Sequence, residues 1–278
     1  MNAPSADIFV MPVKGRDPEL WRPGGFTDQE LADALVRAAI AGPVASHDRA
    51  NVLWRIGRLV DGDPEELFGM SGFESFTVPE VLALIAAETG FDSDPTLHVG
   101  GVSIEPKRLL HALKEAGVRF AEAAIRGERV LLATGHPATL ILFYAAVAEL
   151  LREHGAKVLA PMEGARCSDL MHIGEIRYVD DVGVFSTMGG PIHTHGPEPM
   201  ERMLEEAEPD LVFADHGFAG AAIQAGVETI AIADVNDPAP IVAKAQGRTK
   251  LVIVMDDGRR RKDYWPAYQA IAASFGSS

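Results

Sequence analysis

The sequence predicts an α/β fold in which helices lie on both faces of a mainly parallel sheet, a Rossmann-like three-layer arrangement. Four apolar runs of four or five residues are bounded by turn-forming residues, as buried strands are. A polar or acidic cluster and then a helical pattern follow each run, which is typical of parallel strands joined by helices. The four segments are 129–136, 157–164, 211–217 and 229–238.

The part of the chain before these segments predicts helices. Residues 1–26 are rich in Pro and Gly and are expected to form an extended arm. Thr27 and Glu30 have the spacing of a capping box, which begins a helix. Helical patterns also cover 48–61, 79–89 and 106–126. No strand is predicted before Arg129.

No linker of biased composition separates the helical part from the alternating part. We therefore expect a single α/β domain over residues 1–278. In this domain a mainly helical N-terminal part, 1–126, packs onto a β/α core, 127–278, that contains the functional site. A domain of this length buries about three quarters of the surface that its unfolded chain exposes.

Composition and charge exclude several classes of function. The formal net charge of −15 argues against nucleic-acid binding, which requires clustered Lys and Arg. The longest apolar stretch, 138–148, is shorter than the roughly 20 residues of a membrane span. The N-terminus has no signal-peptide pattern, and a single cysteine, Cys167, fits a reducing cytoplasm. We expect a cytoplasmic protein without nucleic-acid or membrane partners, and a homo-oligomer is compatible with the sequence.

Polar side chains gather where the predicted strands end. Ligands of open α/β sheets bind outside the carboxyl ends of the strands. The positions expected there are Thr134, His136, Asp215, His216, Asp234, Asn236 and Asp237. Titratable and metal-binding groups at one edge of a sheet indicate an enzyme. The sequence contains no Walker A loop, G-x-G-x-x-G, H-E-x-x-H or G-x-S-x-G motif.

The segment 133–139 links a predicted strand to a helix and has features of an anion site. Gly135 permits a tight turn, and free N–H groups at the start of the helix favour an anion. Thr134 and His136 add side-chain donors beside them. The alternative is an ordinary strand-to-helix turn with a capping threonine.

Two acidic segments offer ligands for a cation. Asp215, next to His216, suits a metal ligand, a base or merely the N-cap of the next helix. Asn236 and Asp237 offer oxygen atoms to a hard divalent cation, although Asn and Asp before Pro also form an ordinary turn.

The segment 189–196 contains the most distinctive pattern, His193-Thr-His195 between glycines. In an extended backbone the two imidazoles face the same side, so they are able to chelate one metal ion. Alternatively, one of them protonates a leaving group. The simplest alternative is a surface loop that contains two histidines by chance.

Together these motifs resemble a bacterial phosphatase family, frequent in actinobacteria, whose substrate is uncharacterised. The resemblance covers roughly residues 30–265 and is strongest over 130–245. It implies an enzyme that acts on a phosphorylated small molecule. The motifs that carry the resemblance are 133–137, 193–195, 198–200, 214–217, 219–221, 233–234 and 236–238.

We predict a phosphoric monoester hydrolase that acts on a small phosphorylated metabolite. The predicted substrate-binding residues are Thr134, Gly135, His136 and Asn236. A divalent metal ion, Mg²⁺ or Mn²⁺, is predicted to bind Asp215, Asp237 and His193 and to polarise the phosphoryl group. The predicted catalytic residues are Asp215, His216 and His195, and one of the two histidines protonates the leaving oxygen.

Two other functions are compatible with the same residues. An isomerase or lyase would hold a phosphorylated sugar by its phosphate while His and Asp move protons. A non-catalytic domain would bind a phosphorylated ligand without converting it. Release of inorganic phosphate distinguishes the hydrolase from both.

Overall fold

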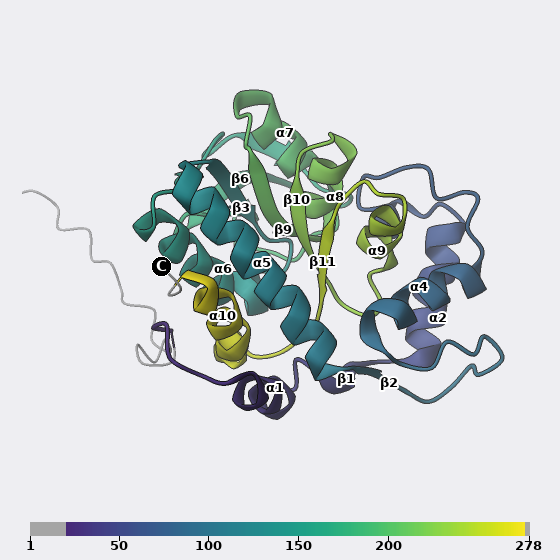
Figure 1. The fold of residues 1–278 in the computed structure, drawn as a ribbon. Coiled ribbons are helices and arrows are strands. Elements are labelled where there is room, and N and C mark those ends of the chain that lie inside the picture. Colours follow the sequence, from purple (N-terminus) through teal and green to yellow (C-terminus); the bar gives the residue numbers. More distant parts are fainter. Residues whose placement is uncertain (1–20, 276–278) are drawn as a thin grey trace, which may run out of the picture.

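The computed structural model describes residues 21–275 and confirms an α/β fold (Figure 1). The predicted N-terminal arm lies largely outside the described residues. Along the chain the elements are α1 (Asp28–Arg37), β1 (Gly42–Asp48), α2 (Arg49–Val60), α3 (Pro64–Leu67), α4 (Val78–Thr89), β2 (Gly101–Ile104), α5 (Pro106–Arg126), β3 (Arg129–Ala133), α6 (Pro137–Glu153), β4 (Lys157–Leu159), β5 (Arg166–Ser168), β6 (Ile173–Val179), β7 (Val182–Thr187), β8 (Gly190–Pro191), α7 (Glu198–Glu206), β9 (Leu211–Asp215), α8 (His216–Gln224), β10 (Thr229–Ala233), α9 (Pro238–Ala245), β11 (Leu251–Val254), η1 (Arg261–Tyr264), α10 (Trp265–Ala272) and η2 (Ala273–Phe275).

Among the described residues, nine strands form one mixed sheet. The strand order is β11-β10-β9-β3-β7-β6-β5, with β4 paired to β3 and β8 paired to β7. β11 pairs with β10, β10 with β9 and β9 with β3, all parallel. The pairs of β3 with β4 and with β7 are also parallel. The pairs among β5, β6, β7 and β8 are antiparallel. The prediction of a mainly parallel sheet is therefore right for one part of the sheet and wrong for the other.

The antiparallel part consists of hairpins without crossover helices. Asp180 and Asp181 join β6 to β7, and both have positive φ angles, 47° and 67°. A turn with two positive φ angles matches the twist of a hairpin. β6 mixes apolar and charged residues and is only partly buried, so no continuous apolar run marks it in the sequence.

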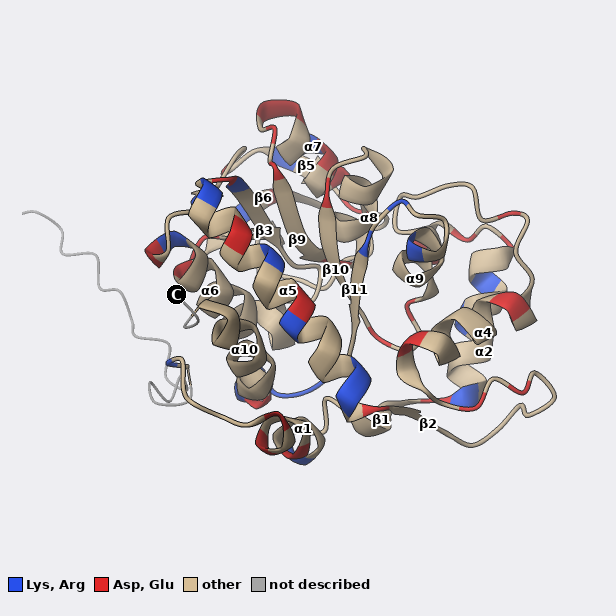
Figure 2. Ribbon diagram, in the orientation of Figure 1, with Lys and Arg blue, Asp and Glu red and all other residues tan. Residues whose placement is uncertain are grey.

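The parallel strands are apolar because both of their faces are covered. Every residue of β9 and β10 is buried. Figure 2 shows these strands in tan over most of their length, whereas acidic and basic residues alternate along α5. In the register of the sheet, Ala133 pairs with Ala214, and Asp215 pairs with Ile232. The loops that follow β3, β9 and β10 therefore leave the sheet at the same edge.

Helices pack on the sheet as the strand–helix pattern suggests. α5 and α10 contact each other and lie in front of the sheet in Figure 1, and α5 also contacts β11. α8 contacts β9 and β10, and α9 contacts β10 and β11. The Rossmann-like three-layer arrangement and the single domain stay predictions. No helix in residues 21–275 has the length and apolar character needed to cross a membrane.

The predicted helices of the N-terminal part are confirmed as α1, α2, α4 and α5. The capping box is also confirmed, since the Thr27 hydroxyl accepts from the Glu30 N–H and the Glu30 carboxylate accepts from the Thr27 N–H. The expectation of no strand before Arg129 is wrong, because β1 and β2 form an antiparallel pair. β1 is largely half-buried or exposed, so it lacks the apolar run on which the prediction relied.

Candidate active site

Loops from several elements bring titratable side chains together at the carboxyl edge of the parallel strands. The loops after β3, β9, β10 and β11 contribute, as does the segment between β8 and α7. The histidines and buried aspartates that gather there are His136, His193, His195, His216, Asp215, Asp234, Asp237, Asp256 and Asp257. Neighbouring imidazoles pack with ring centroids 4.5 to 5.6 Å apart.

His216 lies at the centre of this cluster. Its Nδ1 is 2.7 Å from Asp215 Oδ2, and its Nε2 lies 3.6 Å from Asp237 Oδ2 and 3.8 Å from Asp257 Oδ2. The φ angle of His216 is 48°, a left-handed conformation that is uncommon outside glycine and recurs at functional sites. Burial alone would lower the pKa of His216, but Asp237, the hydrogen bond to Asp215 and the Asp257 charge together raise it to about 10.

The carboxylates around His216 crowd one another. Burial and the charges of Asp237, Asp215 and Asp256 together raise the pKa of Asp257 to about 8, against the lowering effect of His216. Burial and the charges of Asp257, Asp256 and Asp237 also raise the pKa of Asp234 well above its usual value. Like charges at this density are costly without a counter-ion. The cluster therefore suits a bound cation.

His193 and His195 approach His216 from the segment between β8 and α7. His195 Nδ1 is 2.9 Å from the Glu65 carbonyl oxygen. An N–H donated to that carbonyl leaves Nε2 as a free lone pair, the arrangement found in metal-binding histidines. Burial and the charge of His216 lower the pKa of His195 to about 4, so its imidazole is neutral near pH 7. Neutral imidazole is the form that binds metals, so a metal ion at His216 would displace the proton that the neighbouring carboxylates stabilise there.

Two groups of side chains in this cluster have the geometry of a metal site. The ligand atoms within each group all lie within 4.8 Å of one another. The groups are His193 with His195 and His216, and His216 with Asp237 and Asp257.

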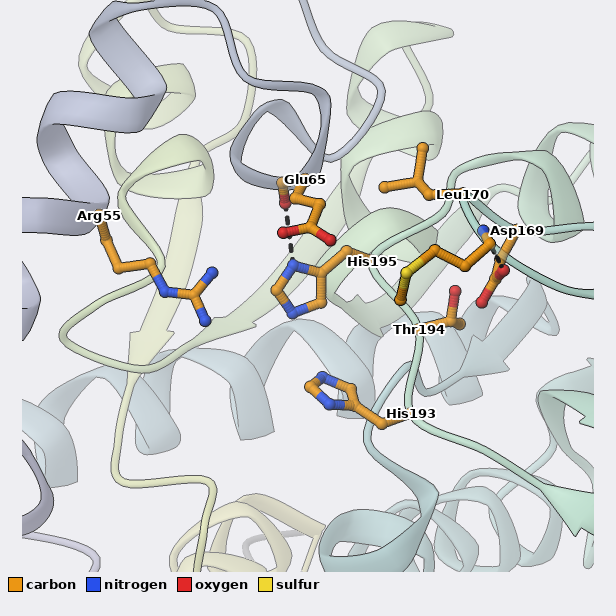
Figure 3. A pocket seen from close by; sticks show the side chains of 8 residues that line it. Arg55, Glu65, Asp169, Leu170, His193, Thr194 and His195 are labelled. Carbon is orange, nitrogen blue, oxygen red and sulfur yellow. Dashed lines mark hydrogen bonds between the residues drawn. The ribbon is translucent and has the colours of Figure 1, made fainter.

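A cavity of about 210 Å³ opens beside the imidazoles (Figure 3). The Arg55 guanidinium extends from α2 toward His195, and the His193 ring lies below the His195 ring in this view. The cavity is therefore bounded by the N-terminal part on one side and by the core on the other. The residues that line it are Arg55, Glu65, Asp169, Leu170, Met171, His193, Thr194 and His195.

Comparison with known proteins identifies the family. A family model described as Phosphatase matches residues 26–275. The protein named Phosphatase SCO2771 from Streptomyces coelicolor is 37% identical over 242 residues, which cover 84% of this chain and 90% of that protein. The chain belongs to the Phosphatase family. The resemblance predicted from the motifs is thereby confirmed.

In this member of the Phosphatase family, two N–H donors of the predicted anion site already form hydrogen bonds within the protein. The Gly135 N–H donates to Asp215 Oδ2 at 3.0 Å, and the His136 N–H donates to Thr134 Oγ1 at 3.0 Å. Thr134 is fully buried. The substrate-binding role of these three residues stays a prediction, and the contacts give Gly135 a clear second role in fixing the Asp215 carboxylate.

The other predicted residues occupy different parts of the cluster. Asp237, His193, His195 and His216 belong to the two groups with metal-site geometry, whereas Asp215 lies behind His216 and contacts its Nδ1. Asn236 lies outside both groups, and its Nδ2 is 3.4 Å from His47 Nδ1. The individual catalytic and metal-binding roles stay predictions.

The sequence analysis did not identify three residues of this candidate site. Asp257 follows the apolar run of β11, but no helix follows directly, so the strand–helix pattern that places the other four strands does not find it. Arg55 and Phe68 come from the N-terminal part, and the fully buried Phe68 ring packs edge-on against the rings of His195 and His216. No local motif marks these two residues, because they reach the site only through the packing of α2 and α3.

Proposed function

We propose that this protein hydrolyses a phosphate monoester of a small metabolite with the help of a divalent metal ion. His216, Asp237 and Asp257 would hold the ion, with His193 and His195 as further ligands. The observation that carries the proposal is that two groups of ligand atoms share His216, each group within 4.8 Å, in a chain of the Phosphatase family. Imidazoles mixed with carboxylates favour Mn²⁺ over Mg²⁺, which prefers oxygen ligands.

A bound divalent ion would supply positive charge to the phosphoryl oxygens and lower the pKa of a coordinated water molecule. The protein residues hold and orient the reacting groups. Asp215 fixes the His216 ring through Nδ1, so that Nε2 faces Asp237 and Asp257. Phe68 packs against the rings of His195 and His216 and helps to fix their positions.

His136 is the best candidate for the general base that takes a proton from the attacking water. It lies outside both groups with metal-site geometry, yet its ring centroid is 4.5 Å from that of His193. Its Nδ1 contacts the Asp257 carbonyl oxygen at 3.1 Å and Thr139 Oγ1 at 2.7 Å. An Nδ1–H donated to the Asp257 carbonyl leaves a lone pair on Nε2, and burial and the charge of His216 lower the pKa of His136, so the ring is suited to accept a proton.

The proposal is tested by the release of inorganic phosphate from a panel of phosphorylated metabolites. We expect Asp237→Asn to lower kcat/KM at least about 100-fold, because it removes a charged ligand from the ion. Asp61→Asn, at an exposed position that ends α2, should retain wild-type activity. Phosphate release at the wild-type rate by folded Asp237→Asn would remove this residue from the reaction.

A further inference from the structure

We propose that Arg55 binds the phosphoryl group of the substrate in the cavity beside His193 and His195. This inference rests on the proposed hydrolase function, because it names the group that receives the phosphate. A phosphate dianion approaching a protein of net charge −15 requires local positive charge. Arginine suits this role because its planar fork of N–H donors matches phosphate oxygens.

Arg55 combines a position beside the imidazoles with unused donors. It lines the 210 Å³ cavity together with His193 and His195, and its guanidinium extends toward His195 in Figure 3. Among the described residues it makes a single hydrogen bond, from Nη1 to Glu66 Oε1 at 2.5 Å. Its Nε is buried without a partner, so Nη2 is the donor left for a ligand. The side chain is 21% exposed, so it is held by the protein and still open to the cavity.

The cavity places Arg55 near two of the proposed metal ligands. Arg55 lines it from α2, and His193 and His195 line it from the segment between β8 and α7. A phosphoryl group in the cavity would therefore lie between the guanidinium and the ion that these histidines would help to hold. Charge on both sides of the phosphoryl oxygens is the arrangement that stabilises phosphoryl transfer.

Arg58 provides a matched comparison on the same helix. It shares Glu66 Oε1 with Arg55, at 2.8 Å from its Nη1. Its other nitrogen atoms bind Asp63 Oδ2 at 2.8 Å and Glu65 Oε2 at 2.6 Å. Carboxylates therefore occupy the whole guanidinium of Arg58, and it does not line the cavity. Both arginines bind Glu66, but only Arg55 lines the cavity. Comparing variants of the two therefore distinguishes a loss of phosphate binding from a loss of the ion pair with Glu66.

The test is calorimetric titration of inorganic phosphate into the full-length protein with Mn²⁺ added, which does not depend on turnover. We expect Arg55→Gln to weaken phosphate binding about 10- to 100-fold, the usual effect of losing charge-assisted hydrogen bonds. Arg55→Lys, which keeps the charge, should fall between wild type and Arg55→Gln. Arg58→Gln should bind phosphate within about twofold of wild type.

The outcomes separate this inference from the hydrolase proposal. Arg55→Gln or Arg55→Lys that is folded and binds phosphate like wild type overturns the role of Arg55, whatever the turnover. An equal loss in Arg58→Gln also overturns it, because the effect would then be structural. Wild-type protein that binds no phosphate overturns it as well. Phosphate binding that depends on Arg55, without release of phosphate from any ester, would uphold the subsite and contradict the hydrolase.

Discussion

At the scale of single residues, His216 adopts a backbone conformation that residues with a side chain disfavour, and this conformation positions its ring in the site. A φ angle of 48° costs energy for a residue with a side chain, yet here it aims Nε2 at Asp237 and Asp257. The cost is offset by the Asp215 contact on the opposite ring nitrogen. From the sequence, the Asp–His pair is visible but its backbone conformation is not.

The role of Asp215 can be tested separately from metal ligation. Asp215→Asn should lower kcat/KM by about 10- to 100-fold, because the His216 ring loses the carboxylate that fixes its tautomer. Metal content, measured by mass spectrometry of the purified protein, should fall as well. Asp33→Asn on the exposed side of α1 is the control and should behave as wild type. A folded Asp215→Asn protein with wild-type kcat/KM would rule out this positioning role.

At the scale of elements, the sequence predicts the buried strands β3, β9 and β10 and the less buried β4, but it misses the buried strands β7 and β11 as well as the partly exposed ones. The continuous apolar runs of β3, β9 and β10 are sufficient to place them. β1 and β6 mix buried and exposed positions without an apolar run, so their pairing becomes visible only in three dimensions. β11 has the apolar run, but a loop and a short 3₁₀ helix follow it, so the strand–helix pattern does not extend to it.

An arginine on α5 ties this helix to the amino ends of two strands. Arg119 binds both carboxylate oxygens of Glu228, at 2.9 and 2.8 Å, and Glu128 at 2.7 Å. The hydrogen bond from Arg119 lowers the pKa of Glu228. Because the folded pKa lies below the unfolded value of about 4.3, the stabilisation is present above that pH and is lost as pH falls through the folded value.

Arg119→Gln should therefore lower the free energy of unfolding by about 1 kcal/mol at pH 7. Glu228 is partly exposed, and solvent screening keeps the effect small. Urea denaturation should show a smaller difference from wild type at pH 3.5. Arg126→Gln, whose carboxylate contacts are 3.4 to 3.5 Å long at an exposed side chain, should have almost no effect. A difference for Arg119→Gln that is constant with pH would contradict the assignment to Glu228.

At the scale of the whole molecule, the site depends on close packing between the N-terminal part and the core. A Cβ atom added at Gly220 on α8 would lie 1.9 Å from the Phe68 carbonyl oxygen. Phe68 in turn packs against His195 and His216. Residues of the first part, such as Arg55, reach the cavity only through this contact and its neighbours. This dependence on long-range packing explains why the sequence reveals most of the aspartates and histidines of the core but not Arg55.

Gly220→Ala should displace Phe68 and lower both stability and activity. We expect a loss of about 2–3 kcal/mol in the free energy of unfolding, as for other overpacked sites, together with a lower kcat/KM. Gly57→Ala in α2 is the matched control, since its Cβ would meet nothing within 4 Å. It should raise stability by about 0.5–1 kcal/mol through helix propensity. Equal thermal stability of Gly220→Ala and wild type would show that the two parts do not pack this closely.

The central claim is that hydrolysis requires a divalent ion held by His216, Asp237 and Asp257. The most direct measurement is phosphate release from an ester that the wild type cleaves, after removal of metal with a chelator and re-addition of Mn²⁺, Mg²⁺ or Zn²⁺ one at a time. We predict that the stripped protein is inactive, that Mn²⁺ restores release better than Mg²⁺, and that Asp257→Asn is not restored. Full release by the stripped protein, or equal recovery in Asp257→Asn, would contradict the account.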